Sequence, residues 1–206
     1  MRKTLFEERF EGMLVSVVDE EGQRLLLSDG CILHSRSEVL CNYQQGMVDL
    51  YECSSPPKRC LHLGLGGGSL ITYYHKLYPT SSHIAVEKCP FMPKIAHRFF
   101  NLPQSRGLTI HIADAYAWCI ESLENEFDLI LLDVCDTEGP ITKFYHLSFI
   151  DCLKKKLNPS GVLLTHLWAS TLPFKKAYKC FETLFPRMRY LALSPSHIAI
   201  ACYKEN

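Results

Sequence analysis

The feature that most constrains the fold of this chain is the alternation of apolar runs with helical segments after Lys58. The runs RCLHLGL, HIAVE, LTIHIAD and FDLILLD are each followed by a stretch of helical periodicity, and GVLLTHL precedes another one. Strands that alternate with helices through short connections predict a parallel sheet covered by helices on both faces.

The last two apolar runs, RYLALS and HIAIACY, are separated only by Ser194-Pro195-Ser196. A connection this short predicts a hairpin, so the final strand should be antiparallel to the others. We therefore predict an α/β protein with a Rossmann-like class I methyltransferase fold: a mostly parallel, seven-stranded sheet whose last strand is antiparallel.

The pattern before residue 57 is different. GMLVSVVDEEGQRLLLSDGCILHS alternates polar and apolar residues and is punctuated by Glu-Gly and Asp-Gly, which predicts two or three short antiparallel strands. A helical stretch follows over about residues 37–52, and SSPPK then interrupts the chain. We expect two units: residues 1–57 as an N-terminal β-hairpin extension plus a helix, and residues 58–206 as a Rossmann-like nucleoside-binding domain.

Composition excludes several classes of protein. Lys plus Arg and Asp plus Glu both total 22, so no net charge favours nucleic acid or an anionic membrane. No apolar stretch reads as a signal peptide or membrane span, which predicts a soluble, cytoplasmic protein. The ten cysteines are scattered without C-x-x-C spacing, so we expect buried, reduced thiols and no metal site. The run 154–156, three lysines, is interpreted as a solvated helix end.

The strand ends carry the candidate binding residues, because ligands of open α/β sheets bind at the carboxyl edge. The first strand runs into a loop that permits close backbone approach to a ligand and contains Gly64, Gly66, Gly67 and Gly68. The second ends at Glu87, at about the distance along the chain where such folds place an acid on a ribose diol. The third and fourth end at Asp114 and Asp133. This succession predicts a nucleoside site.

Asp133, Asp136 and Glu138 crowd together just before Gly139-Pro140. Carboxylates this close repel one another, unless a cation or bound ligand neutralises them or solvent screens them. An acidic, solvated loop and a site for a cationic ligand both fit the cluster by itself.

The motifs LGLGGGSL, AVEKCP, HIADAYAW, DVCDTEGP and KKKLNPSGVLL, in this order, resemble the spermidine synthase family of polyamine aminopropyltransferases and its spermidine synthase-like relatives. The resemblance extends from about Gly12 to the last strand. Its most specific part is Asp133-x-x-Asp136-x-x-Gly139-Pro140, which these enzymes use as the catalytic loop between two substrates.

The resemblance implies a co-substrate of the thioadenosine type, decarboxylated S-adenosylmethionine, and no tightly bound cofactor. By this analogy Glu87 would hold the ribose hydroxyls, and Asp114 with Ala115 would meet the adenine. Asp133 would lie beside the sulfonium, and Asp136 would act as general base or electrostatic partner of the attacking amine.

The same resemblance implies that Tyr43 and Gln44 contribute to the substrate cavity, and that the reaction is aminopropyl transfer to a small polyamine such as putrescine. The chemistry is consistent with the acids, since a primary amine has a pKa of about 10 and must lose a proton before it attacks. A homodimer is a further expectation from the family.

Departures from the family pattern leave other functions open. Gly67 replaces the loop aspartate that holds the aminopropyl ammonium, and Leu33, Thr137 and His166 also replace family residues. One alternative is an S-adenosylmethionine-dependent methyltransferase, because a neutral loop admits the methionine carboxylate. Another is a homologue that binds a thioadenosine without turnover.

Overall fold

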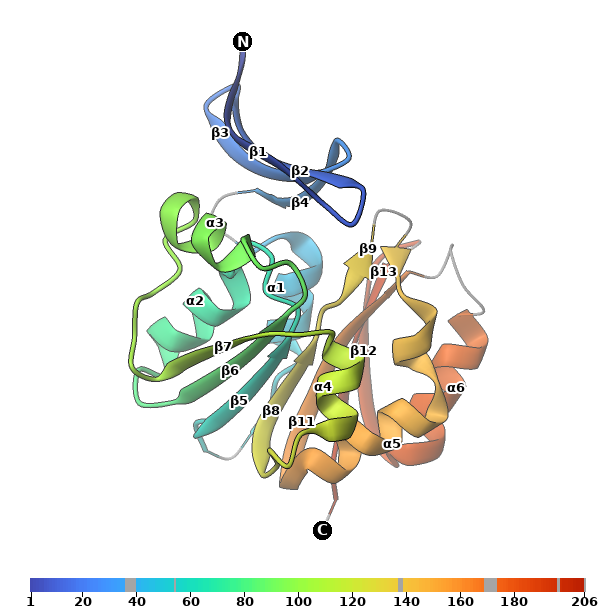
Figure 1. The fold of residues 1–206 in the computed structure, drawn as a ribbon. Helices are drawn as coiled ribbons and strands as arrows, with labels where there is room; N and C mark the ends of the chain where they lie inside the picture. The colour runs from blue at the N-terminus through green and yellow to red at the C-terminus, as the bar shows by residue number, and fades with distance from the viewer. Residues whose placement is uncertain (36–39, 54, 137–138, 169–173, 196, 206) are drawn as a thin grey trace.

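The computed structural model describes residues 1–35, 40–53, 55–136, 139–168, 174–195 and 197–205. Its central element is a seven-stranded sheet in the order β12-β13-β11-β8-β5-β6-β7 (Figure 1). In chain order, the strands of this sheet are β5 (Arg59–Leu63), β6 (Ser82–Glu87), β7 (Leu108–Ile112), β8 (Phe127–Leu132), β11 (Leu157–Trp168), β12 (Arg187–Ser194) and β13 (His197–Tyr203).

Strand directions confirm the predicted fold class. The strands β11, β8, β5, β6 and β7 pair in parallel, whereas β13 is antiparallel to both of its neighbours, β11 and β12. The order also reverses between β5 and β8: the chain first builds β6 and β7 on one side of β5 and then returns to add β8 on the other. Ligands of open α/β sheets bind outside the strand ends at such a reversal.

Helices cover both faces of this sheet (Figure 1). Leu61 and Leu63 point to the face that packs against α4, α5 and α6, and Cys60 points to the face of α1 and α2. This alternation follows from the two-residue period of a strand, and it makes the central strands apolar throughout. The helical elements are α1 (Asn42–Asp49), α2 (Ser69–Leu77), α3 (Met92–Phe99), α4 (Ala115–Glu121), the 3-10 turn η1 (Thr142–Tyr145), α5 (Leu147–Lys156) and α6 (Phe174–Leu184).

The N-terminal segment forms a separate four-stranded antiparallel sheet. We predicted two or three strands there and missed the first, β1, because its charged side chains resemble a solvated segment. Strand β1 pairs along its length with β2, and side chains Val15, Val17 and Leu26 of the sheet pack in one cluster with α3. The strands are β1 (Arg2–Phe10), β2 (Met13–Glu20), β3 (Gln23–Ser28) and β4 (Cys31–Ser35).

Helix α1 begins at Asn42, several residues after the start that we predicted, and residues 36–39 lie outside the described part of the chain. The helix packs against β11, β12 and β13, so it covers the large sheet although it precedes residue 57. The division of the chain into two units at residue 57 stays a prediction.

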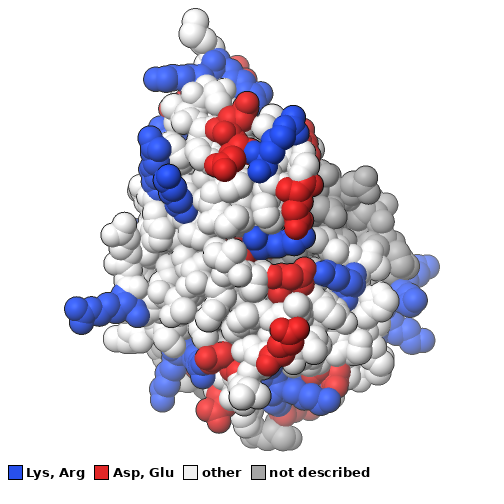
Figure 2. Space-filling view, in the orientation of Figure 1, with Lys and Arg blue, Asp and Glu red and all other residues white. Residues whose placement is uncertain are grey.

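The surface has the mixed charge that the composition indicates. Figure 2 shows Lys and Arg interspersed with Asp and Glu over the face that it draws. Cys31, Cys41 and Cys53 are exposed free thiols, which corrects the expectation that all the cysteines are buried. No helix in the described ranges is both long and apolar enough to cross a membrane.

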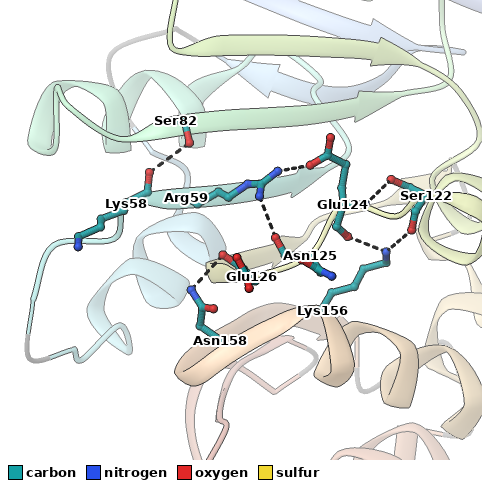
Figure 3. Close-up of polar contacts among 9 residues, drawn as sticks. All are labelled: Lys58, Arg59, Ser82, Ser122, Glu124, Asn125, Glu126, Lys156 and Asn158. Atoms are coloured by element: carbon teal, nitrogen blue, oxygen red, sulfur yellow. Dashed lines mark hydrogen bonds and ion pairs between the residues drawn. The ribbon is translucent and has the colours of Figure 1, made fainter.

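Lys156 corrects the interpretation of the three lysines as a solvated helix end. Its side chain is only 7% exposed, and its ammonium donates 2.8 Å hydrogen bonds to the carbonyls of Ser122 and Glu124 (Figure 3). These carbonyls belong to the connection between α4 and β8. The buried cation therefore holds together the end of α5 and the segment that leads into a central strand.

Replacing Lys156 by alanine should lower the free energy of unfolding by about 1–3 kcal/mol, because two partly buried carbonyls lose a charged donor. Lys155→Ala is the matched control. The Lys155 side chain is 76% exposed and pairs with Asp151 on the same helix, so the loss should be much smaller than for Lys156→Ala. Urea unfolding of both variants measures the difference, and equal losses would contradict a structural role for Lys156.

Candidate functional site

The predicted strand ends meet at the carboxyl edge of the sheet. The amide of Gly64 donates to the carbonyl of Val86 and the amide of Asp133 donates to that of Leu63, both at 3.0 Å. The backbone hydrogen bonds between β6, β5 and β8 thus continue up to Gly64 and Asp133. The glycine loop, Glu87 and Asp133 are therefore neighbours on one edge.

Gly64 brings the glycine loop directly against Asp133. Its φ is +93°, and a Cβ atom there would lie 2.4 Å from the Asp133 carbonyl oxygen. Gly68, with φ +81°, caps the N-terminus of α2. A Cβ atom added to Gly68 would meet the side chain of Leu102. Gly66, with φ +52°, faces open space, and Gly67 is buried. The loop leaves room for a ligand at Gly66 and none at Gly64.

Glu87 fastens the glycine loop to the end of β6. One of its carboxylate oxygens accepts the Leu65 amide at 3.0 Å, and the other accepts the Cys89 amide at 2.8 Å. A carboxylate oxygen has two acceptor positions, so Glu87 keeps further lone pairs for a hydroxyl ligand. Its place on the edge matches the predicted ribose-binding acid, whose role stays a prediction.

Asp114 is the N-cap of α4, and Ala115 is the first residue of that helix. One Asp114 oxygen accepts the amides of Tyr116 and Ala117, and the other accepts the Lys143 ammonium at 2.8 Å. Burial by itself would raise the pKa of Asp114, but the Lys143 ammonium and the two amides lower it below its ordinary value. Nothing in the sequence pattern indicated the partnership with Lys143, because η1 follows a turn and shows no periodicity.

Asp133 is partly buried and is held by a short polar chain. The Tyr43 hydroxyl donates to Asp133 Oδ2 at 3.2 Å, and the Gln44 side-chain amide lies 3.5 Å from that hydroxyl. Ser69, at the start of α2, donates to Gln44 Oε1 at 2.8 Å. The chain from Ser69 to Asp133 therefore joins the glycine loop, α1 and the end of β8. Tyr43 and Gln44, predicted at the substrate cavity, lie beside the predicted acid.

Desolvation raises the pKa of Asp133 to about 6, although the hydrogen bonds from Tyr43 and Gln44 oppose the shift. The carboxyl group is therefore ionised at neutral pH and gains a proton just below it. A carboxylate with so little solvation of its own is a strong partner for a cation that enters the edge.

Asp136 lies in the two-residue strand β9 (Cys135–Asp136), which pairs with β10 (Gly139–Pro140) in a small antiparallel hairpin. The two described ends of the predicted acidic loop thus pair with each other after the end of β8. The side chain of Asp136 and residues 137–138 lie outside what the structure describes, so the proposed role of Asp136 rests on its sequence position.

His166 is the site residue that the sequence did not assign to a role, although it was visible as a departure from the family pattern. It lies at the end of β11 with its ring flat against Tyr43, the ring centroids being 4.4 Å apart. The pattern could not indicate this contact, because Tyr43 and His166 come from elements far apart in the chain. No cluster of three or more potential metal ligands is found among the described residues.

Comparison with known families gives one matching model, the spermine/spermidine synthase domain, over residues 84–196. The eEF1A lysine and N-terminal methyltransferase of Bos taurus is 33% identical over 170 residues, which cover 73% of this chain and 24% of the relative. The polyamine aminopropyltransferase of Chromobacterium violaceum is 26% identical over 144 residues, which cover 70% of this chain and 54% of the relative. The chain thus spans only part of the length of these relatives.

Among solved structures, human methyltransferase-like protein 13 in complex with SAH superposes with a TM-score of 0.72 at 25% identity. The superposition covers 81% of this chain and 83% of that one. A methyltransferase-like protein therefore shares this chain's fold, and the sequence relatives include both a methyltransferase and an aminopropyltransferase.

Replacing Gly64 by alanine should cost about 3 kcal/mol of unfolding free energy, because the new Cβ would overlap a backbone carbonyl at a strained φ. Gly66→Ala meets only the strain of its left-handed backbone, about 1 kcal/mol, since no atom lies within 4 Å of its Cβ position. Urea unfolding of the two variants measures this contrast. Equal losses would show that the loop does not touch Asp133 as described.

Proposed function

Because the chain belongs to the spermine/spermidine synthase domain family, we propose that it transfers an alkyl group from an S-adenosyl donor to an amine. The observation that carries the proposal is the partly buried Asp133 carboxylate, held by Tyr43 directly beside the glycine loop. More specifically, the group is aminopropyl, the donor is decarboxylated S-adenosylmethionine, and the acceptor is a small polyamine such as putrescine.

In this proposal the donor lies along the carboxyl edge of the sheet. Its ribose hydroxyls donate to the free lone pairs of Glu87, and the open position at Gly66 receives the sugar and sulfur. The adenine lies near Asp114 and Ala115, where its amino group shares Asp114 with the Lys143 ammonium. These positions are supported by the order of the groups along the edge.

The acids provide the chemistry that an amine acceptor needs. The acceptor arrives as an ammonium, is attracted by Asp133 and gives up one proton, for which Asp136 is the proposed base. The amine nitrogen then attacks the carbon next to sulfur. As the new C–N bond forms, the C–S bond breaks and its electron pair stays on sulfur, so that the sulfonium becomes a neutral thioether. The alkylated amine leaves as a secondary ammonium, which keeps its charge at neutral pH, so the one proton released is the proton that Asp136 takes up and passes on to solvent.

Methyl transfer to an amine is a second candidate, and two observations favour it. Gly67 provides no carboxylate for an aminopropyl ammonium, and one of the relatives reported above is a methyltransferase. The bond changes at nitrogen and sulfur are the same in both reactions, so Asp133 suits either one. The two candidates differ in the donor that the loop accepts.

Donor preference separates these functions. We expect isothermal titration calorimetry to give binding at least tenfold tighter, about 1.4 kcal/mol, for decarboxylated S-adenosylmethionine than for S-adenosylmethionine. Glu87→Gln should weaken both donors and methylthioadenosine alike, because all three contain the ribose.

Tighter binding of S-adenosylmethionine would overturn aminopropyl transfer in favour of methyl transfer. Binding of methylthioadenosine together with either donor, but without product on addition of amines, would identify a thioadenosine-binding homologue. Failure of all three ligands to bind would overturn the donor site itself.

The pH dependence of turnover tests Asp133. Since its pKa is about 6 and the reaction needs the carboxylate, kcat/KM should rise with pH through about 6 in the wild-type protein. Asp133→Asn should lower kcat/KM about 100-fold and remove this rise, because the amide neither titrates nor attracts the ammonium. Steady-state kinetics from pH 5 to pH 8 measure both effects, and an unchanged rise in the variant would exclude Asp133 as its source.

A further inference from the structure

The wall of the site next to Asp133 is built from aromatic rings that the proposed chemistry does not use. The His166 ring lies 4.4 Å from that of Tyr43, centroid to centroid, with their planes 14° apart. His166 is only 6% exposed, so this flat contact is shielded from solvent. The Tyr43 hydroxyl, on the same ring, is the donor to Asp133 Oδ2.

The orientation of the His166 ring is fixed by a hydrogen bond to His197. Its Nε2 lies 2.9 Å from Nδ1 of His197, and the two imidazole planes are 9° apart. One nitrogen donates and the other accepts, which two neutral imidazoles can do. His197 is paired opposite Trp168 between β13 and β11, and its ring centroid lies 5.2 Å from that of Trp168. A hydrogen bond of this kind prevents the His166 ring from turning away from Tyr43.

The charges around this wall are few. Burial, and to a smaller extent the neighbouring His197, lowers the pKa of His166 to about 3, so the ring is neutral from pH 5 to pH 8. Asp133 faces Tyr43 and Gln44, with Cys41 also close enough to interact. From η1, the Tyr145 hydroxyl donates to the backbone carbonyl of His166.

We propose that His166 is a positioning residue for Asp133, which acts by holding the Tyr43 ring so that its hydroxyl donates to the Asp133 carboxylate. The contact passes from the His197 side of β13, through the His166 ring, to Tyr43 on α1 and then to the end of β8. The part that Asp133 plays in the reaction rests on the proposed function. The dependence of its ionisation on His166 is independent of that function.

The inference follows from the flat contact between His166 and Tyr43, which adds to the packing of Tyr43 against the buried cluster of α1 and α2. A tyrosine ring rotates about its Cα–Cβ bond unless packing prevents it, and a stacked ring on one flat face restricts this rotation at small entropic cost. If the stack is removed, the hydroxyl spends less time on Asp133. The carboxylate then loses one of the hydrogen bonds that favour its charged form, and protons bind to it more tightly.

The test is the titration of Asp133, followed by the carboxyl ¹³C signal in protein labelled at aspartate and assigned with Asp133→Asn. Tyr43→Phe should raise the titration midpoint by about 0.5 to 1 pH unit, the equivalent of one hydrogen bond to a carboxylate. His166→Ala should raise it in the same direction, because the Tyr43 ring is then held less firmly. His166→Phe keeps a flat ring against Tyr43 and should leave the midpoint within about 0.2 pH unit of the wild type.

The second histidine pair of the chain provides a matched control. His62 Nε2 and His83 Nδ1 lie 3.1 Å apart between β5 and β6, and both residues are buried. His83→Asn disturbs a buried imidazole pair of the same kind without touching Tyr43, so the Asp133 midpoint should not move. Unfolding curves of all variants establish that each titration is measured on folded protein.

The proposal is overturned if His166→Ala leaves the Asp133 midpoint unchanged while Tyr43→Phe raises it, or if His166→Phe shifts it as much as His166→Ala. Because the titration needs neither donor nor acceptor, it is independent of the proposed reaction. If the titration shifts occur as expected but the protein binds no donor, the proposed function is refuted and the positioning role of His166 stands. If the protein turns over but the shifts are absent, the positioning role is refuted and the proposed function stands.

In an active protein, the same variants give a kinetic readout that a merely structural role would not produce. The rise of kcat/KM near pH 6 should move to higher pH in His166→Ala and stay in place in His166→Phe. A general loss of packing would lower kcat/KM at all pH values and leave this rise where it is.

Discussion

The site depends on the contact between two backbones at the centre of the sheet. Strands β5 and β8 are neighbours because the strand order reverses between them, and Gly64 then lies so close to the Asp133 carbonyl that no side chain fits there. This contact places the glycine loop, which leads into α2, next to the strand that ends in the acids. Glu87 fixes the loop from the other side by accepting the Leu65 amide, and its other oxygen accepts the Cys89 amide just after β6. The edge is thus shaped by main-chain packing before any side chain contributes chemistry.

Much of this arrangement could be predicted from the sequence, because it depends on local patterns. The apolar runs identify strands, the short Ser-Pro-Ser connection requires an antiparallel end, and the parallel order brings Gly64, Glu87, Asp114 and Asp133 to one edge. Strand β1 was missed because its pairing with β2, and not its own apolar content, makes it a strand.

The features that could not be predicted are contacts between distant elements. Tyr43 meets His166 only because α1 packs on β11 and β13, and Lys156 is buried only because two carbonyls of another connection need a donor. Residue type pointed away from both contacts, since histidines and lysines are usually exposed. The family resemblance predicted roles for Asp114, Asp133 and Tyr43, but not the contact of His166 with Tyr43 or the ion pair of Lys143 with Asp114.

The ion pair between Lys143 and Asp114 couples the position of the turn after β10 to that of the N-terminus of α4. Lys143 lies in the turn that follows β10, so the acidic hairpin is tied to the cap of α4 through a single ammonium. Free-energy linkage is reciprocal: whatever competes for the Asp114 carboxylate also loosens the turn, and whatever draws the turn toward β8 exposes that carboxylate. The cap of α4 and the turn after the acidic hairpin, which are 29 residues apart in the chain at this ion pair, are therefore coupled in position.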